Sequence, residues 1–105
     1  MARQTDKKWY SNGLKAEEAL KLEKKYAKIE GPVYGLKDGD FVALQFSLRF
    51  EHSRECDYHL AETEDIEQLF FRTKTTKVAQ LEGKVIEAFL EGKLLRGISV
   101  NPNFV

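Results

Sequence analysis

Both histidines and the single cysteine of the chain fall within one short stretch, FEHSRECDYHL (50–60). His52, Cys56 and His59 have the spacing H-x3-C-x2-H. Imidazole and thiolate are ligands that zinc prefers, and a zinc site needs them to converge on one ion within about 2.0–2.3 Å. A histidine beside a cysteine can also activate the thiolate as a nucleophile. The arrangement of the strands determines whether these residues form a zinc site, a histidine-activated cysteine or an ordinary hairpin.

The strands around this stretch determine whether the three side chains can converge. Residues 33–52 alternate apolar and polar types, which predicts a turn at Asp38-Gly39 and then a long strand, with a short strand over 56–61 beside it. A three-residue turn matches the apolar partners across the two strands. The predicted pairs are His52 with Cys56, Phe50 with Tyr58, and Leu48 with Leu60. His59 then points to the opposite face, which disfavours a three-ligand site.

His52 and Cys56 remain as a weak candidate pair, without a predicted metal, cofactor or catalytic role. A partly buried cysteine is most often a small hydrophobic residue. The chain contains no phosphate-binding loop of the G-x4-G-K-[ST] or G-x-G-x-x-G type, and neither G-x-S-x-G nor H-E-x-x-H. A non-catalytic protein is therefore favoured. The alternative is a small enzyme, or a ligand- or metal-binding protein, with a site near His52, Cys56, Tyr58 or His59.

Two helices are predicted from apolar spacing. GLKAEEALKLEKKYAKIEGP (13–32) places Ala19, Leu22, Tyr26 and Ile29 at helical intervals and predicts an N-terminal amphipathic helix. TEDIEQLFFRTKT (63–75) predicts a shorter helix with Thr63 as its cap and Ile66, Leu69 and Phe70 on its inner face.

The last third of the chain predicts a further hairpin. LEGKVIEAF and LEGKLLRGI (81–98) use similar turn chemistry twice, and a turn at Glu91-Gly92 would place Glu87 opposite Arg96. Residues 76–82 are compatible with strand or loop. The whole chain, 1–105, is predicted to be one α+β domain with an antiparallel sheet of about four to six strands built from hairpins, and the short helix between the hairpins. Residues 1–10 are expected to be a flexible arm and 101–105 a tail.

Composition predicts a soluble cytoplasmic protein. The single cysteine fits a reducing compartment, and no apolar run approaches the ~20 residues that span a membrane. The net charge is zero, but the signs are separated along the chain. Residues 29–71 hold three basic and ten acidic residues, whereas 1–28 and 72–105 are basic. Folding of the ends against the middle, or a polar surface for a charged partner, would both explain this pattern.

Binding of a protein partner, or self-association, is the predicted function. The apolar residues on both faces of the last strands exceed what two short helices can cover, so either a second copy or the arm with Trp9 and Tyr10 must cover them. The candidate contacts are Phe71, Arg72 and Lys74 on the second helix and Glu51 and Glu55 on the acidic hairpin. A weak nucleic-acid binder, using the basic N-terminal helix and residues 72–77, is a further alternative. Nucleic acid is the less favoured partner, because KDGDFVAL (37–44) has acids where an RNA-binding sheet carries stacking aromatics.

Overall fold

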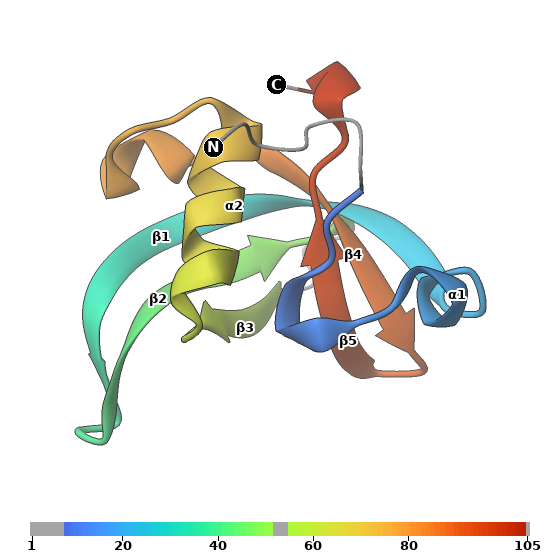
Figure 1. Cartoon of the computed structure of the whole chain (residues 1–105), viewed down its shortest axis with the longest axis horizontal. Helices are drawn as coiled ribbons and strands as arrows, with labels where there is room; N and C mark the ends of the chain where they lie inside the picture. Colours follow the sequence, from blue (N-terminus) through green and yellow to red (C-terminus); the bar gives the residue numbers. More distant parts are fainter. Residues whose placement is uncertain (1–7, 52–54, 105) are drawn as a thin grey trace.

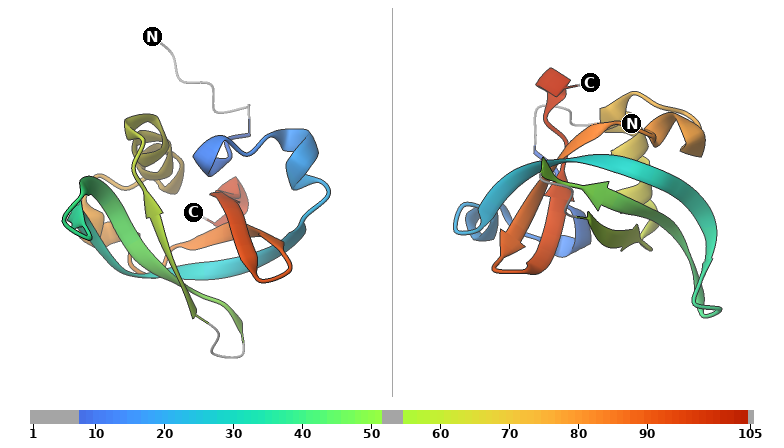
Figure 2. Two further views of the ribbon diagram at one scale, coloured as in Figure 1. Left: turned by 90° about the horizontal axis from the view of Figure 1, so that it is seen from below. Right: turned by 180° about the vertical axis from the view of Figure 1, so that it is seen from behind.

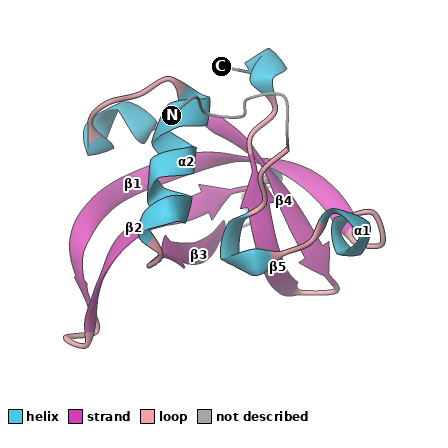
Figure 3. Ribbon diagram, in the orientation of Figure 1, coloured by secondary structure: helices cyan, strands magenta, loops and turns pink. Residues whose placement is uncertain are grey.

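The computed structural model describes residues 8–51 and 55–104 (Figure 1). The elements, in order, are η1 (Ser11–Gly13), α1 (Ala16–Ala19), β1 (Glu23–Lys37), β2 (Phe41–Arg49), β3 (Glu55–Leu60), α2 (Thr63–Thr73), η3 (Val78–Leu81), β4 (Val85–Glu91), β5 (Leu94–Ser99) and η4 (Pro102–Phe104). The predicted α+β class, with an antiparallel sheet and a helix packed on it, is confirmed. Figure 3 shows how far the strands outweigh the helices.

The five strands form one antiparallel sheet in the order β3-β2-β1-β4-β5. β1 holds the sheet together, because it pairs with β4 over residues 23–28 and with β2 over residues 28–37. The chain returns through α2 and η3 to place β4 beside β1, which is the Greek-key order. Figure 2 shows the sheet curled around a concave side that α2 and the N-terminal segment cover. In the described part of the chain, the two edge strands, β3 and β5, do not pair with each other, so the curled sheet is open between them.

The predicted N-terminal helix over 13–32 is wrong. α1 has only four residues, and a strand begins at Glu23. Ala27 and Ile29 point into the core, whereas Lys24, Tyr26 and Lys28 are exposed. Buried and exposed side chains therefore alternate with the period of two that is typical of a strand. The local spacing also fits a helix, but hydrogen bonds to a strand on each side override helix propensity.

Two predicted strand registers are also wrong. Cys56 pairs with Leu48 instead of His52, and Tyr58 pairs with Phe46 instead of Phe50. The pairing ends at Arg49 and Glu55, so the connection between β2 and β3 is longer than a three-residue turn. The slip is an even number of residues, which leaves every side chain on its predicted face.

In the β4–β5 hairpin, Glu87 lies opposite Ser99 and not Arg96. The chain turns at Gly92 and Lys93, and a bulge at Phe89 and Leu90 shifts the register further. Arg96 donates to Glu91 of the same hairpin instead, at 2.8 Å.

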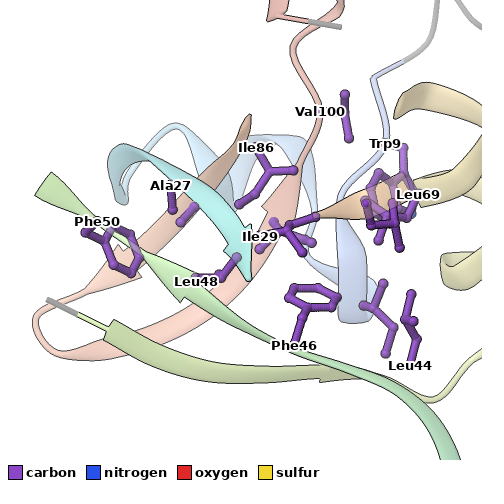
Figure 4. Packing of buried hydrophobic residues seen from close by; sticks show 14 of the residues in the cluster. Trp9, Ala27, Ile29, Leu44, Phe46, Leu48, Phe50, Leu69, Ile86 and Val100 are labelled. Atoms are coloured by element: carbon purple, nitrogen blue, oxygen red, sulfur yellow. The ribbon is translucent and has the colours of Figure 1, made fainter. Parts of the chain in front are cut away.

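The main core lies on the concave side of the sheet. Its fully buried side chains come from all layers of the fold, including Ile29, Leu48, Ile86 and Ile98 of the sheet and Leu69 of α2. Ile66 and Phe70 pack against them, which confirms the predicted inner face of α2. Trp9 belongs to this core with 9% of its surface exposed, although the sequence placed it in a flexible arm (Figure 4). Residues 1–7 of that arm, and residue 105 of the predicted tail, lie outside the described residues.

Within the described residues, none of the helices is both long enough and apolar enough to cross a membrane.

Candidate functional site

The candidate metal ligands do not converge. Cys56 lies on the inner face of β3 and is half-buried, with its Sγ 3.6 Å from the carbonyl oxygen of Asp57. His59 lies on the outer face, where its ring centroid is 5.6 Å from that of Phe41. His52 lies outside the described residues. In the part of the chain that the structure describes, no three His, Cys, Asp or Glu side chains are placed to hold a metal ion.

His59 lines a shallow cleft of about 370 Å³ on the outer face of β1, β2 and β3. Ser47 is in the same cleft, and its Oγ donates to Asp57 Oδ1 at 3.0 Å. This serine therefore hydrogen-bonds a carboxylate, whereas the base that activates a serine nucleophile is most often an imidazole. Lys37 donates to Asp38 at 2.8 Å, and this bond lowers the pKa of the Asp38 carboxyl. The cleft offers polar contacts to a small ligand, and among its described lining residues no hydrogen bond joins Ser47 to an imidazole.

The predicted partner-binding residues fall on two separate elements. Phe71, Arg72 and Lys74 lie at the end of α2, where Arg72 Nε donates to Gln68 Oε1 at 2.8 Å and burial lowers the Arg72 pKa. Glu51 and Glu55 flank the β2–β3 connection.

Glu55 is already engaged by Arg49. The Arg49 guanidinium bridges Glu55 at 2.8 Å and Glu30 at 2.6 Å, and the hydrogen bond to Arg49 lowers the pKa of Glu30.

The basic helix face of the nucleic-acid alternative does not exist. Lys24, Lys25 and Lys28 lie on β1. Lys24 Nζ is 3.5 Å from the buried carboxylate of Glu87, which raises the Lys24 pKa. Lys8 reaches the same carboxylate at 2.6 Å. Lys8 and Lys24 thus balance the charge of a buried acid.

The most exposed apolar surface lies where β1 and β2 extend past their neighbours. We call residues 33–43 the ribbon. The last pair of β1 with β4 is at Lys28, and the last pair of β2 with β3 is at Leu44, so the ribbon has two strands and two open edges. Figure 1 shows it projecting away from α2. Its exposed side chains are Val33 (57%), Tyr34 (59%), Leu36 (65%), Phe41 (41%) and Val42 (46%).

Turn chemistry allows the ribbon to project. Asp38 and Gly39 both adopt positive φ (54° and 76°), and the N–H of Asp40 donates to the carbonyl of Lys37 at 3.0 Å. Two such residues twist a turn in the sense that matches paired strands. Leu36 lies directly opposite Val42, and Tyr34 opposite Leu44, so the inner face is apolar to the end.

A second organised site lies between the two edge strands, β3 and β5. Residues 8–14, which we call the strap, fill this seam. Asp65 of α2 accepts two hydrogen bonds from the strap, one from Trp9 Nε1 and one from the backbone N–H of Asn12, each 3.0 Å long. Ser11 Oγ accepts from the N–H of Ile98 on the edge of β5, at 2.8 Å.

Tyr58 completes the seam from the β3 side. Its hydroxyl bonds Ser11 Oγ and accepts from Asn12 Nδ2 at 2.6 Å. Burial raises the pKa of Tyr58 to about 12. On the outer side of β5, the ring of Tyr10 meets Phe89 edge to face at 5.3 Å between centroids. The strap therefore covers part of the apolar surface of the last strands. This agrees with the sequence-based expectation that the arm with Trp9 and Tyr10 covers them.

Neither the ribbon nor the seam was among the predicted sites. The signal for the ribbon was present as apolar residues on both faces around the Asp38-Gly39 turn. The signal for the seam is the pair Trp9-Tyr10 just before Ser11 and Asn12, within the arm of residues 1–10 that the sequence predicts to be flexible.

Comparisons with protein-family models, curated proteins and solved structures found no match to this chain.

Proposed function

We propose that the protein is a non-catalytic, self-associating module in which the ribbons of two copies pair. The observation that supports this is the group of five exposed apolar side chains on a two-stranded projection with open edges. An exposed apolar edge strand is a template for pairing with another chain.

The ribbon is complementary to itself. An antiparallel copy of β1 centred on Gly35 places Tyr34 beside Leu36 of the second copy, and Leu36 beside its Tyr34. Gly35 meets Gly35, so no side chains collide at the axis, and Lys37 lies beside Val33 without like charges in opposition. Gln45 Nε2 contacts the carbonyls of Gly35 and Leu36 at 3.4 and 3.3 Å, the long end of hydrogen bonding, so these carbonyls are held loosely.

The area suits a weak dimer. The exposed fractions of the five side chains amount to roughly 500 Å² per copy, near the upper limit for a patch on a monomer. Burial of all five side chains in both copies would amount to about 1,000 Å², the lower bound for a specific interface. Pairing through β1 buries only part of this area, because Val33 and Phe41 lie on the opposite face from Tyr34, Leu36 and Val42. We therefore expect dissociation in the micromolar to millimolar range.

Nucleic acid suits this surface less well. Asp38 and Asp40 at the end of the ribbon would repel phosphate. Lys37, the cation of the ribbon, already contacts Asp38 at 2.8 Å.

Sedimentation equilibrium over about 10 µM to 1 mM tests the proposal. The wild type should dimerise, and Leu36→Glu should remain monomeric because it places a carboxylate against Tyr34 of the second copy. Leu94→Glu is the matched control, since Leu94 is 60% exposed on the β4–β5 hairpin. A wild type that stays monomeric, or a dimer that Leu94→Glu disrupts equally, contradicts the proposal.

A further inference from the structure

We propose that Asn12-Gly13, within the strap, is a site of intramolecular deamidation that the folded seam holds in check. Both residues are exposed, so water can reach them, whereas Ser11 and Leu14 on either side are buried. The reaction needs no partner besides water. It involves other residues than the ribbon and does not depend on self-association.

The chemistry is that of an asparagine followed by a glycine. The backbone nitrogen of Gly13 attacks the side-chain carbonyl carbon of Asn12, a new N–C bond forms, and the Gly13 amide proton passes to water. The bond from that carbon to Nδ2 then breaks, and this nitrogen takes up a proton and leaves as ammonia. Water hydrolyses the resulting succinimide ring at either of its carbonyls, which gives aspartate or isoaspartate. Glycine permits the attack because no side chain crowds its nitrogen.

The backbone of Asn12 is held in a conformation that prevents ring closure. Closure requires the Gly13 nitrogen and the Asn12 Cβ atom to lie on the same side of the Cα–C bond. Asn12 has φ 56° and ψ 32°, the left-handed conformation, in which that nitrogen lies nearly trans to Cβ. Asparagine visits this conformation more readily than most residues do. Asp65 supports it here by accepting from the Asn12 N–H at 3.0 Å.

The side chain of Asn12 is held as well. Its Nδ2, the leaving group of the reaction, donates to the hydroxyl of Tyr58 at 2.6 Å. Because the buried Ser11 and Leu14 anchor the chain on both sides, a large rotation about the Asn12 Cα–C bond must break one or more of these contacts. The reaction therefore proceeds only in the fraction of molecules in which this part of the seam is locally open.

The product does not fit the seam as asparagine does. The Nδ2 donor to Tyr58 is lost, and aspartate brings a second carboxylate near Asp65, where like charges repel. Isoaspartate also lengthens the backbone by one carbon atom between the buried Ser11 and Leu14. Conversion of Asn12 therefore weakens the contacts of the strap and leaves an irreversible record that the seam has opened.

Peptide mapping by mass spectrometry of the full-length protein, incubated at mildly alkaline pH, tests the site. Conversion of Asn12 should be at least about tenfold faster in urea than in the folded wild type, because the unfolded chain has no seam. Under native conditions Asp65→Ala should convert at least about threefold faster than the wild type, and Glu64→Ala should match the wild type. Asn101 is an internal control in every sample, since the nitrogen of Pro102 carries no proton to lose.

Circular dichroism shows whether Asp65→Ala is folded. If it is unfolded, Tyr58→Phe takes its place and should also convert faster than the wild type, because it removes the acceptor of Nδ2. A folded wild type that converts Asn12 as fast as the unfolded chain overturns the proposal. It is also overturned if the folded variant converts no faster than Glu64→Ala, or if the unfolded chain converts Asn12 no faster than Asn101.

Discussion

Asp65→Ala should weaken the seam measurably. Asp65 is 8% exposed, and its carboxylate accepts from Trp9 Nε1 and from the N–H of Asn12, both at 3.0 Å. A hydrogen bond to a charged group contributes about 1.5–3 kcal/mol. The indole N–H would be left buried without an acceptor, whereas the exposed Asn12 can turn to water. We therefore expect a loss of about 2–4 kcal/mol in the free energy of unfolding.

Urea unfolding followed by tryptophan fluorescence measures this loss at the site itself, because Trp9 is the only tryptophan of the chain. Far-ultraviolet circular dichroism on the same samples reports the sheet. Glu64→Ala is the control, since Glu64 is exposed in the same helical turn and carries the same favourable position near the start of α2. An Asp65→Ala chain within about 0.5 kcal/mol of Glu64→Ala would refute the role given to Asp65.

Two further substitutions probe the seam from β3 and β5. Burial raises the pKa of Tyr58 to about 12 from 10.0, so the unfolded chain releases its proton first, and the stabilisation by Tyr58 is complete below pH 10 and lost as the pH rises towards 12. Relative to Tyr58→Phe, the wild type should lose about 2 kcal/mol in urea unfolding across that window, and an unchanged difference would contradict the burial of the hydroxyl. Gly97→Ala should cost about 1–3 kcal/mol, because its Cβ would press on the strap. Gly35→Ala, at a position with open space, should cost nothing, and equal effects would show that the strap does not lie against β5.

The spacing of apolar residues in the sequence predicted correctly the element whose conformation does not depend on pairing with distant strands. The α2 helix was predicted because Ile66, Leu69 and Phe70 form a stripe that only a helix can align. The segment 13–32 was misassigned because its apolar residues fit both a helix and a strand. Its conformation depends on β2 and β4, which supply hydrogen-bond partners on both sides of β1.

Matching of apolar residues predicted which side chains of β2 and β3 face the core. It did not predict which residue of one strand lies opposite which residue of the other. Leu48 can pair with Cys56 or Leu60, since both are apolar and separated by an even number of residues. Cys56 and His59 lie on opposite faces of one strand, as the alternation of the sequence predicts, so they cannot converge on one ion. Recognising the ribbon requires knowing where β3 and β4 end, and recognising the seam requires the curl that brings Tyr58 near Ser11. Both are long-range properties of the fold.

The pairing of two ribbons about Gly35 is tested most directly by a disulfide across the proposed axis. Residues opposite each other in antiparallel strands have Cα atoms about 4.5–5.5 Å apart, within the range that a disulfide spans. Gly35→Cys in a Cys56→Ser background leaves one thiol per chain, at a position where a new side chain meets open space. Leu94→Cys in the same background is the control. Self-association through the ribbon predicts rapid formation of a cross-linked dimer by Gly35→Cys alone under mild oxidation. No cross-link, or equal cross-linking by both variants, would contradict it.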